Sequence, residues 1–214
     1  MNDDSSDGKL SRKEREFQAR RQEILEAATR LFARQGYHGT AMSEIAKEAE
    51  FSTGSLYNFF KNKEELYFSL LQEKIEVLEQ EAYGVLEEDK SVEEKLRNYV
   101  DKMLTFFEAE RDFFRIYVEQ RTQFEMSAKG EFAERMFEKM QKYLGKMMLT
   151  MEQGVREGLF KPVNPAELAM VFVGLINNIL TVYINTNISS GLREKGGLIL
   201  DLFFNGVRRR GGEG

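Results

Sequence analysis

The chain has 214 residues and a net charge of −5, with two prolines, no cysteine, no tryptophan and one histidine, His38. Its length allows one large or two small domains, and its richness in helix-favouring residues predicts an all-α protein. Without cysteine there are no disulfides or thiolate metal sites, and a single histidine argues against a histidine metal site or a catalytic triad. We therefore expect no metal, no cofactor and no enzyme activity.

The N-terminal residues 1–11 are polar and acidic, and we expect them to be disordered. They do not resemble a signal peptide, so a cytoplasmic location is expected. A first helix is predicted over about 12–35. Its buried side consists of Ile24, Ala27, Ala28, Leu31 and Phe32. Gly36 is expected to end it.

Residues 40–66, TAMSEIAKEAEFSTGSLYNFFKNKEEL, read as two short helices about a turn, followed by the start of a third. Apolar residues mark one side of each short helix: Ile45, Ala46 and Ala49, then Leu56, Phe59 and Phe60. The expected N-caps of the three helices are Thr40, Ser52 and Asn62. Such a unit, with an exposed helix carrying Ser, Thr, Gly, Tyr and Asn, suits the major groove of DNA.

The charge distribution agrees with this interpretation. Residues 9–63 hold eleven basic against seven acidic side chains, a surplus of four, while residues 1–8 and 64–214 are acidic. Because the surplus is modest, we expect the sequence-independent part of DNA affinity to be modest too.

Residues 20–71 resemble the DNA-binding half of the TetR family of bacterial transcriptional regulators. The resemblance lies in the aliphatic positions of the first helix, the G-Y-x-x-T link, the I-A pair, the S-x-G-x-L-Y helix and the F-K-x-K-E-E-L exit. It implies a helix-turn-helix domain over 12–62 and a ligand-binding and dimerisation domain over 63–210, with about nine helices in all. The helix from 63 would connect the two.

The resemblance also implies which residues touch DNA. The exposed face consists of Ser52, Thr53, Gly54, Ser55, Tyr57 and Asn58, and phosphate contacts fall to Thr40 and Lys63. Phe59 stands where many relatives carry tyrosine or histidine, so it either packs or leaves that anchor missing. Since this helix has no arginine, specificity should lean on Tyr57, Asn58 and DNA shape. The basic stretch over 9–21 is either a solvated extension of the first helix or an arm that touches DNA.

Five further helices are expected after the connector, which should run to about residue 87. They cover about 92–110, 112–124, 130–158, 165–189 and 192–210. Two of them have strong start signals: Ser91 with Glu94, and Asn164 followed by Pro165. The apolar run over 168–188 contains four asparagines, so we interpret it as a buried protein interface rather than a membrane span.

These helices are rich in aromatic residues and methionine, which a ligand pocket and a filled core would share. The family resemblance implies a small-molecule effector, and a hydrophobic or amphipathic one is expected. The candidate ligand contacts are Met103, Phe107, Phe114, Tyr117, Met140, Tyr143, Met147, Phe172 and Asn177. For Asn177 a hydrogen bond between subunits is an equal alternative.

The last two helices are expected to form a homodimer interface, because their apolar stripes would be too large to leave exposed. The stripe residues are Val171, Phe172, Leu175, Ile179, Val182, Leu198, Leu202, Phe203 and Gly206. Two subunits would present two recognition helices to an inverted repeat. The favoured hypothesis is a repressor that its ligand releases from double-stranded operator DNA; the alternative is a regulator or activator without a small ligand.

Overall fold

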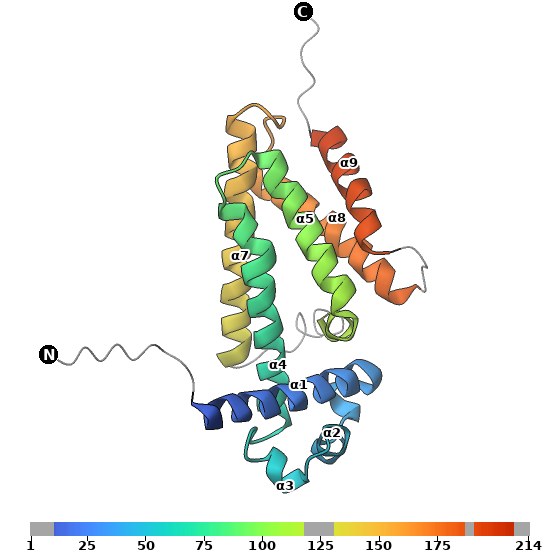
Figure 1. Ribbon diagram of the computed structural model, residues 1–214. Helices are drawn as coiled ribbons and strands as arrows, with labels where there is room; N and C mark the ends of the chain where they lie inside the picture. Colours follow the sequence, from blue (N-terminus) through green and yellow to red (C-terminus); the bar gives the residue numbers. More distant parts are fainter. Residues whose placement is uncertain (1–10, 118–130, 187–190, 208–214) are drawn as a thin grey trace, which may run out of the picture. The chain divides into compact units, whose positions relative to one another are not determined.

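A computed structural model describes residues 11–117, 131–186 and 191–207 (Figure 1). Across these ranges every regular element is a helix, which confirms the all-α prediction. The chain divides into two compact units, Met1–Gln72 and Glu73–Gly214. Each unit buries its own set of apolar side chains.

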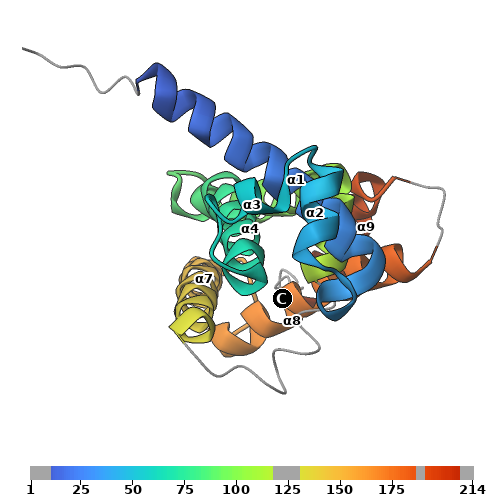
Figure 2. The ribbon, with the colours of Figure 1, turned by 90° about the horizontal axis from the view of Figure 1, so that it is seen from below.

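The first unit contains α1 (Arg12–Gly39), α2 (Met42–Glu48), α3 (Thr53–Leu56) and the beginning of α4 (Lys63–Leu78). Its core joins all four helices through Ile24, Phe32, Ile45, Leu56 and Leu66, each at most 1% exposed. Figure 2 shows the N-terminal part of α1 extending beyond α2 and α3. Ser11 and Glu14 form a capping box that starts α1 at Arg12.

Gly36 interrupts α1 as predicted, although one further helical turn follows it. Its φ of 71° lies in the left-handed region, which glycine adopts at little cost. The chain then reaches α2 through residues 37–41. The Lys63 side chain of α4 donates hydrogen bonds to two backbone carbonyls of this link.

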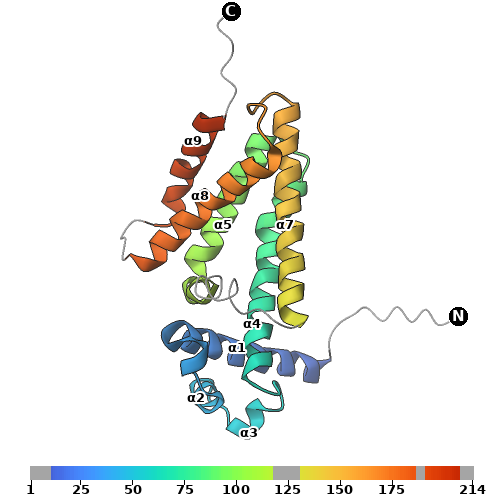
Figure 3. The same ribbon diagram turned by 180° about the vertical axis from the view of Figure 1, so that it is seen from behind.

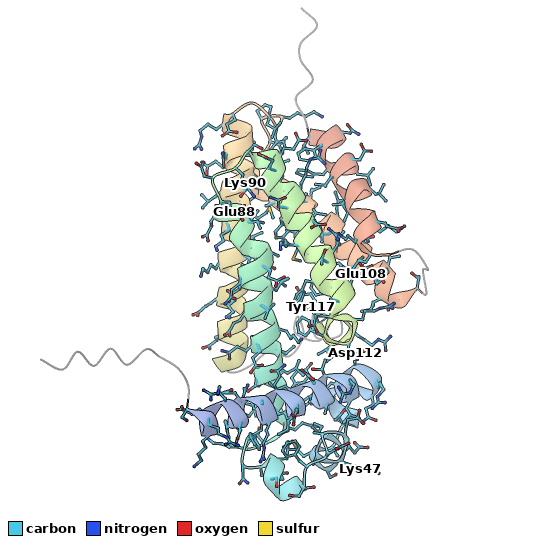
Figure 4. The ribbon with its side chains drawn as sticks, viewed as in Figure 1. Lys47, Glu88, Lys90, Glu108, Asp112 and Tyr117 are labelled. Atoms are coloured by element: carbon cyan, nitrogen blue, oxygen red, sulfur yellow. The ribbon has the colours of Figure 1, made fainter. Side chains whose placement is uncertain are left out.

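The second unit is a bundle of α5 (Val92–Ala109), α7 (Glu131–Arg156), α8 (Pro165–Asn185) and α9 (Gly196–Val207) with the end of α4. Figures 1 and 3 show α8 running obliquely across α5, with α9 beside them. The Phe172 ring of α8 lies 4.7 Å from that of Phe203 on α9 and 6.2 Å from that of Tyr99 on α5. Near the C-terminal end of α5, the Glu108 carboxylate accepts a hydrogen bond of 2.7 Å from the Leu192 backbone N–H (Figure 4).

The connector departs from the single helix predicted over 63–87. Its α-helical part ends at Leu78 and continues as a π-helix, η1 (Glu79–Tyr83), and a 3₁₀-helix, η2 (Gly84–Glu87). Asn62 does cap α4, since its side-chain oxygen accepts from the Glu65 N–H at 2.8 Å. The Glu65 carboxylate reaches Lys61 N–H rather than completing a box with Asn62.

Other predicted boundaries hold more closely. Ser91 with Glu94 forms the expected capping box of α5, and Asn164 caps α8 ahead of Pro165. Residues 111–117 are helical, and the rest of the helix predicted over 112–124 lies outside the described residues. The last predicted helix is divided: a 3₁₀ turn, η3 (Arg193–Lys195), precedes α9.

Candidate functional site

The segment from Ser52 to Phe60 forms a short helix and a turn rather than the longer helix predicted. Only Thr53–Leu56 is α-helical, and N–H groups of Asn58 and Phe59 then bond to carbonyls three residues back, at 3.1 and 3.0 Å. Ser52 is the N-cap, as predicted, and its hydroxyl oxygen accepts from the Ser55 N–H at 3.1 Å. Burial of Leu56 and Phe60 fixes which side of the segment faces outward.

The residues predicted to read DNA are gathered on that outward side. Thr53, Gly54 and Asn58 are exposed, and the Tyr57 side chain is 50% exposed. Ser55 is half-buried, with its hydroxyl 2.8 Å from that of Ser52. At Gly54 no atom lies within 4 Å of the position a Cβ would take, so another backbone can approach closely there. A compact polar surface results, with hydroxyl, phenol and amide groups suited to phosphates and base edges.

The turn that precedes α3 holds a backbone conformation that side chains disfavour. Glu50 has a φ of 61°, the one positive φ of a non-glycine residue in the ranges described. The Phe51 N–H closes the turn on the Ala46 carbonyl at 2.8 Å. Because a non-glycine residue seldom adopts such a φ, the conformation of this turn is set by the hydrogen bond and the packing around it.

Thr40 is not the N-cap of α2 that the sequence predicted. The N-cap of α2 is Ala41, whose N–H donates to the Glu44 carboxylate at 2.8 Å. The Thr40 side chain is 2% exposed, and its hydroxyl donates to the Gly36 carbonyl at 2.8 Å. The hydroxyl therefore closes the break in α1 and is not presented to solvent.

Lys63, the other predicted phosphate contact, is engaged within the protein. Its ammonium donates to the carbonyls of Tyr37 and Thr40, at 2.7 and 2.8 Å, and lies 4.5 Å from the centre of the Tyr37 ring. The side chain thus ties the start of α4 to the link between α1 and α2. Lys63 positions the helix-turn-helix whether or not it also meets phosphate.

Phe59 packs, which answers the question that its sequence left open. Its ring stacks on that of Phe17 at 4.7 Å and meets that of Phe51 edge-on at 6.0 Å. Next to this stack, the Arg21 guanidinium lies 5.1 Å from the centre of the Phe60 ring. The N-terminal part of α1 is thereby attached to the segment Ser52–Phe60, the candidate recognition segment. The sequence predicted no role for Phe17 or Phe51. No local pattern indicates that the rings of Phe17 and Phe59, 42 residues apart, are in contact.

Several predicted ligand contacts meet in the second unit, but they pack against one another. The Phe107 ring lies 4.6 Å from that of Phe114 and 5.5 Å from that of Tyr117. Met103, Phe107, Phe114, Met147 and Phe172 are all buried. Tyr117 and Asn177 are partly exposed, and Figure 4 places Tyr117 close to the end of α5. The Met140 side chain lies outside the described residues. Tyr143 stacks on Tyr83, a residue that the sequence did not identify.

The predicted interface stripes divide into exposed and buried residues. Phe172 and Phe203 contact each other inside the subunit and are 0% and 1% exposed, so they are unavailable to a second subunit. An apolar face remains, formed by Val171, Leu175, Ile179, Val182, Leu198 and Leu202. Four of these are more than 40% exposed, and the Cβ positions of Gly174 and Gly206 meet no atom within 4 Å. By length and composition alone, the helix α8 could cross a membrane, and 33% of its most apolar window is buried in the subunit. Length and composition therefore do not decide what covers the exposed apolar side of α8.

Comparison with known proteins agrees with the division of the chain into two units. The family model "Bacterial regulatory proteins, tetR family" matches residues 24–70, and "Tetracyclin repressor-like, C-terminal domain" matches residues 89–183. The fatty acid metabolism regulator protein of Bacillus subtilis is 26% identical over 88% of this chain and 95% of its own.

Solved structures share the fold. AibR in complex with isovaleryl coenzyme A and operator DNA has a TM-score of 0.74 at 24% identity, over 86% of this chain and 98% of its own. FadR of Bacillus subtilis with stearoyl-CoA has a TM-score of 0.69 at 23% identity, over 87% and 99%. A regulator from Saccharomonospora viridis with choline has a TM-score of 0.76 at 20% identity, over 90% and 100%. Proteins of this fold therefore take ligands of more than one kind.

Proposed function

The chain belongs to the TetR family of DNA-binding transcriptional regulators, and from that premise we propose that it is a homodimeric repressor released from an inverted-repeat operator by an acyl-coenzyme A. The observation that carries the proposal is the polar face from Ser52 to Asn58, exposed outward over buried Leu56 and Phe60. The exposed polar side chains of this face do not contribute to the core of the helix-turn-helix, and their groups suit a DNA groove.

The proposed DNA contacts come from Thr53, Gly54, Ser55, Tyr57 and Asn58. With no arginine among them, bidentate guanine recognition is absent from this segment, and sequence preference should depend on the phenol, the amide and DNA shape. Thr40 is not included, because its hydroxyl is buried and bonded to Gly36.

The N-terminal part of α1 extends the proposed interface. Phe17 faces the recognition segment through its stack on Phe59. Lys13 and Arg20 are four residues before and three residues after Phe17, which places them on the same side of α1. Over residues 12–21 there are five basic and two acidic side chains, a surplus of three. That surplus beside the reading surface fits contact with phosphates.

The apolar face on α8 and α9 supports dimerisation. Its large side chains are exposed in the single subunit, and two open glycine positions would let the helices of a second copy approach. A twofold pair would carry two recognition segments to major grooves about 34 to 36 Å apart. Binding of an inverted repeat follows from this symmetry.

An acyl-coenzyme A is the proposed effector class because two proteins of similar fold carry one, and a full-length relative regulates fatty acid metabolism. The alternative is a regulator or activator without a small ligand. The mutual packing of Phe107, Phe114 and their neighbours favours it, since a filled core needs no ligand. Release of DNA by the ligand requires unequal affinity for two conformations, and α4 is the helix present in both units.

Selection of bound sequences from random duplex DNA, followed by a release assay, tests the proposal. We expect an inverted repeat to be enriched, and the protein to leave it on addition of isovaleryl-, octanoyl- or stearoyl-CoA but not of coenzyme A alone. Failure to enrich any sequence contradicts the operator. Enrichment without release by any of the three contradicts the proposed effector class.

A further inference from the structure

Three tyrosines from three elements of the second unit are in ring contact. Tyr83 ends the π-helix η1, Tyr99 lies on α5 and Tyr143 on α7. The rings of Tyr83 and Tyr143 are stacked with centroids 3.6 Å apart and planes 10° apart, and the Tyr99 ring is 5.7 Å from that of Tyr83. The hydroxyls of Tyr83 and Tyr99 are hydrogen-bonded to each other. Tyr143 belongs to the ring cluster but not to this hydrogen bond.

The Tyr143 hydroxyl is buried without a hydrogen-bond partner, and in the part of the chain that the structure describes no other side-chain nitrogen or oxygen is in this state. A buried hydroxyl without a partner is unfavourable, and phenylalanine would fill the same space without that cost. Such a group in a folded protein calls for an acceptor, which an ordered water or a bound ligand can supply.

The surroundings of this hydroxyl restrict the chemistry of that acceptor. On α7, Lys139 precedes Tyr143 by one turn and Lys146 follows it by about one turn. Their ammonium groups are held by Glu79 at 3.0 Å and Glu87 at 2.9 Å, on the η1 and η2 side. Burial raises the pKa of both Tyr83 and Tyr99, so these phenols stay neutral at physiological pH. The cluster thus offers a neutral donor and cations already paired with carboxylates, which favours an uncharged carbonyl over a carboxylate.

The backbone beside the cluster is irregular in a way that often accompanies function. A π-helix is rare and is commonly found at functional positions, and here it places Tyr83 against Tyr143. Because η1 continues directly from α4, a group bound against Tyr143 lies next to the end of the helix that enters from the first unit.

We propose that the Tyr143 hydroxyl donates a hydrogen bond to the thioester carbonyl oxygen of a bound acyl-coenzyme A. The inference rests on the effector class of the proposed function. It adds that the protein recognises the carbonyl itself, so the free fatty acid and a thioether lacking that oxygen are weaker ligands.

A cycle of two proteins and two ligands tests the hydrogen bond. Affinity is measured by calorimetry for the full chain and its Tyr143→Phe variant. Each is titrated with the tightest-binding of isovaleryl-, octanoyl- and stearoyl-CoA, and with the S-alkyl-CoA thioether of the same chain length. We expect the unsubstituted protein to prefer the thioester roughly tenfold, the usual size of one neutral hydrogen bond. In Tyr143→Phe this preference disappears, and both ligands bind as the thioether binds the unsubstituted protein.

Tyr183→Phe is the matched control, because the Tyr183 ring lies against Arg111 and not against Tyr83. It should keep the tenfold preference. The melting temperature of ligand-free Tyr143→Phe gives a second readout: it should equal or exceed that of the unsubstituted protein, since a hydroxyl without a partner is removed.

The outcomes separate this inference from the proposed function. Acyl-CoA binding with the same thioester preference in Tyr143→Phe overturns the inference alone. Equal weakening of both ligands, or a lowered melting temperature, gives the hydroxyl a structural role and also overturns it. If no acyl-CoA binds the unsubstituted protein, the effector class itself is wrong and the inference falls with it.

Discussion

Replacing Lys63 by alanine should weaken the fold of the DNA-binding unit. The ammonium makes two charge-assisted hydrogen bonds, to the carbonyls of Tyr37 and Thr40, and sits over the Tyr37 ring. Hydrogen bonds of this kind contribute roughly 1.5–3 kcal/mol each when buried, and a cation over a ring roughly 0.5–1 kcal/mol. Lys63 is only half-buried, so water can replace part of this. We expect Lys63→Ala to lower the free energy of unfolding by about 1.5–3 kcal/mol.

Urea unfolding followed by far-ultraviolet circular dichroism measures this loss, at one protein concentration because the proposed dimerisation would contribute to stability. Lys61→Ala is the control, since Lys61 is exposed two residues away, and its change should stay within about 0.5 kcal/mol. Operator affinity is measured on the same samples below the unfolding transition. If Lys63→Ala unfolds like the unsubstituted protein yet loses operator affinity, the main role of Lys63 is to contact phosphate. Its hydrogen bonds to Tyr37 and Thr40 then do not stabilise the unit.

Three further predictions concern the surface. Tyr57→Ala should weaken operator binding at least tenfold in a fluorescence anisotropy titration at fixed salt, with unchanged unfolding, because the phenol is half-exposed over the reading face; unchanged affinity would remove that assignment. Lys13→Gln combined with Arg20→Gln should reduce the slope of log affinity against log salt by about 1–2, as expected for one or two lost phosphate contacts. An unchanged slope would mean that this part of α1 does not contact phosphates. Leu202→Glu puts a charge on a side chain that is 54% exposed on the apolar face, and sedimentation should then show folded monomers; an intact dimer would place the interface elsewhere.

The fold was predictable where its signals are local. Ser52, Ser91 and Asn164 cap the helices for which the sequence proposed them, because each cap depends on residues two or three positions away. The N-cap predicted at Thr40 is wrong by one residue. The Ala41 N–H donates to the Glu44 carboxylate, so Ala41 is the N-cap, and the Thr40 hydroxyl donates to the Gly36 carbonyl at the break in α1. The π and 3₁₀ turns after Leu78 interrupt a regular apolar pattern that gives no warning of them.

The site was predictable only in its local part. The exposed face of Thr53, Tyr57 and Asn58 follows from the helical positions of Leu56 and Phe60. Which apolar residues of α8 and α9 stay exposed depends on α5 and on contacts between the helices, so Phe172 and Phe203 were assigned to the wrong side. The same holds for the rings of Phe17 and Phe59 and of Tyr83 and Tyr143, which meet across 42 and 60 residues.

Sedimentation of the protein alone and with its selected duplex tests most directly that two copies of the Ser52–Asn58 face read DNA together. We expect a dimer without DNA, and two subunits on each inverted repeat with half-sites about one helical turn apart. A protein that stays monomeric and binds a single half-site with the affinity of the full repeat would contradict the account.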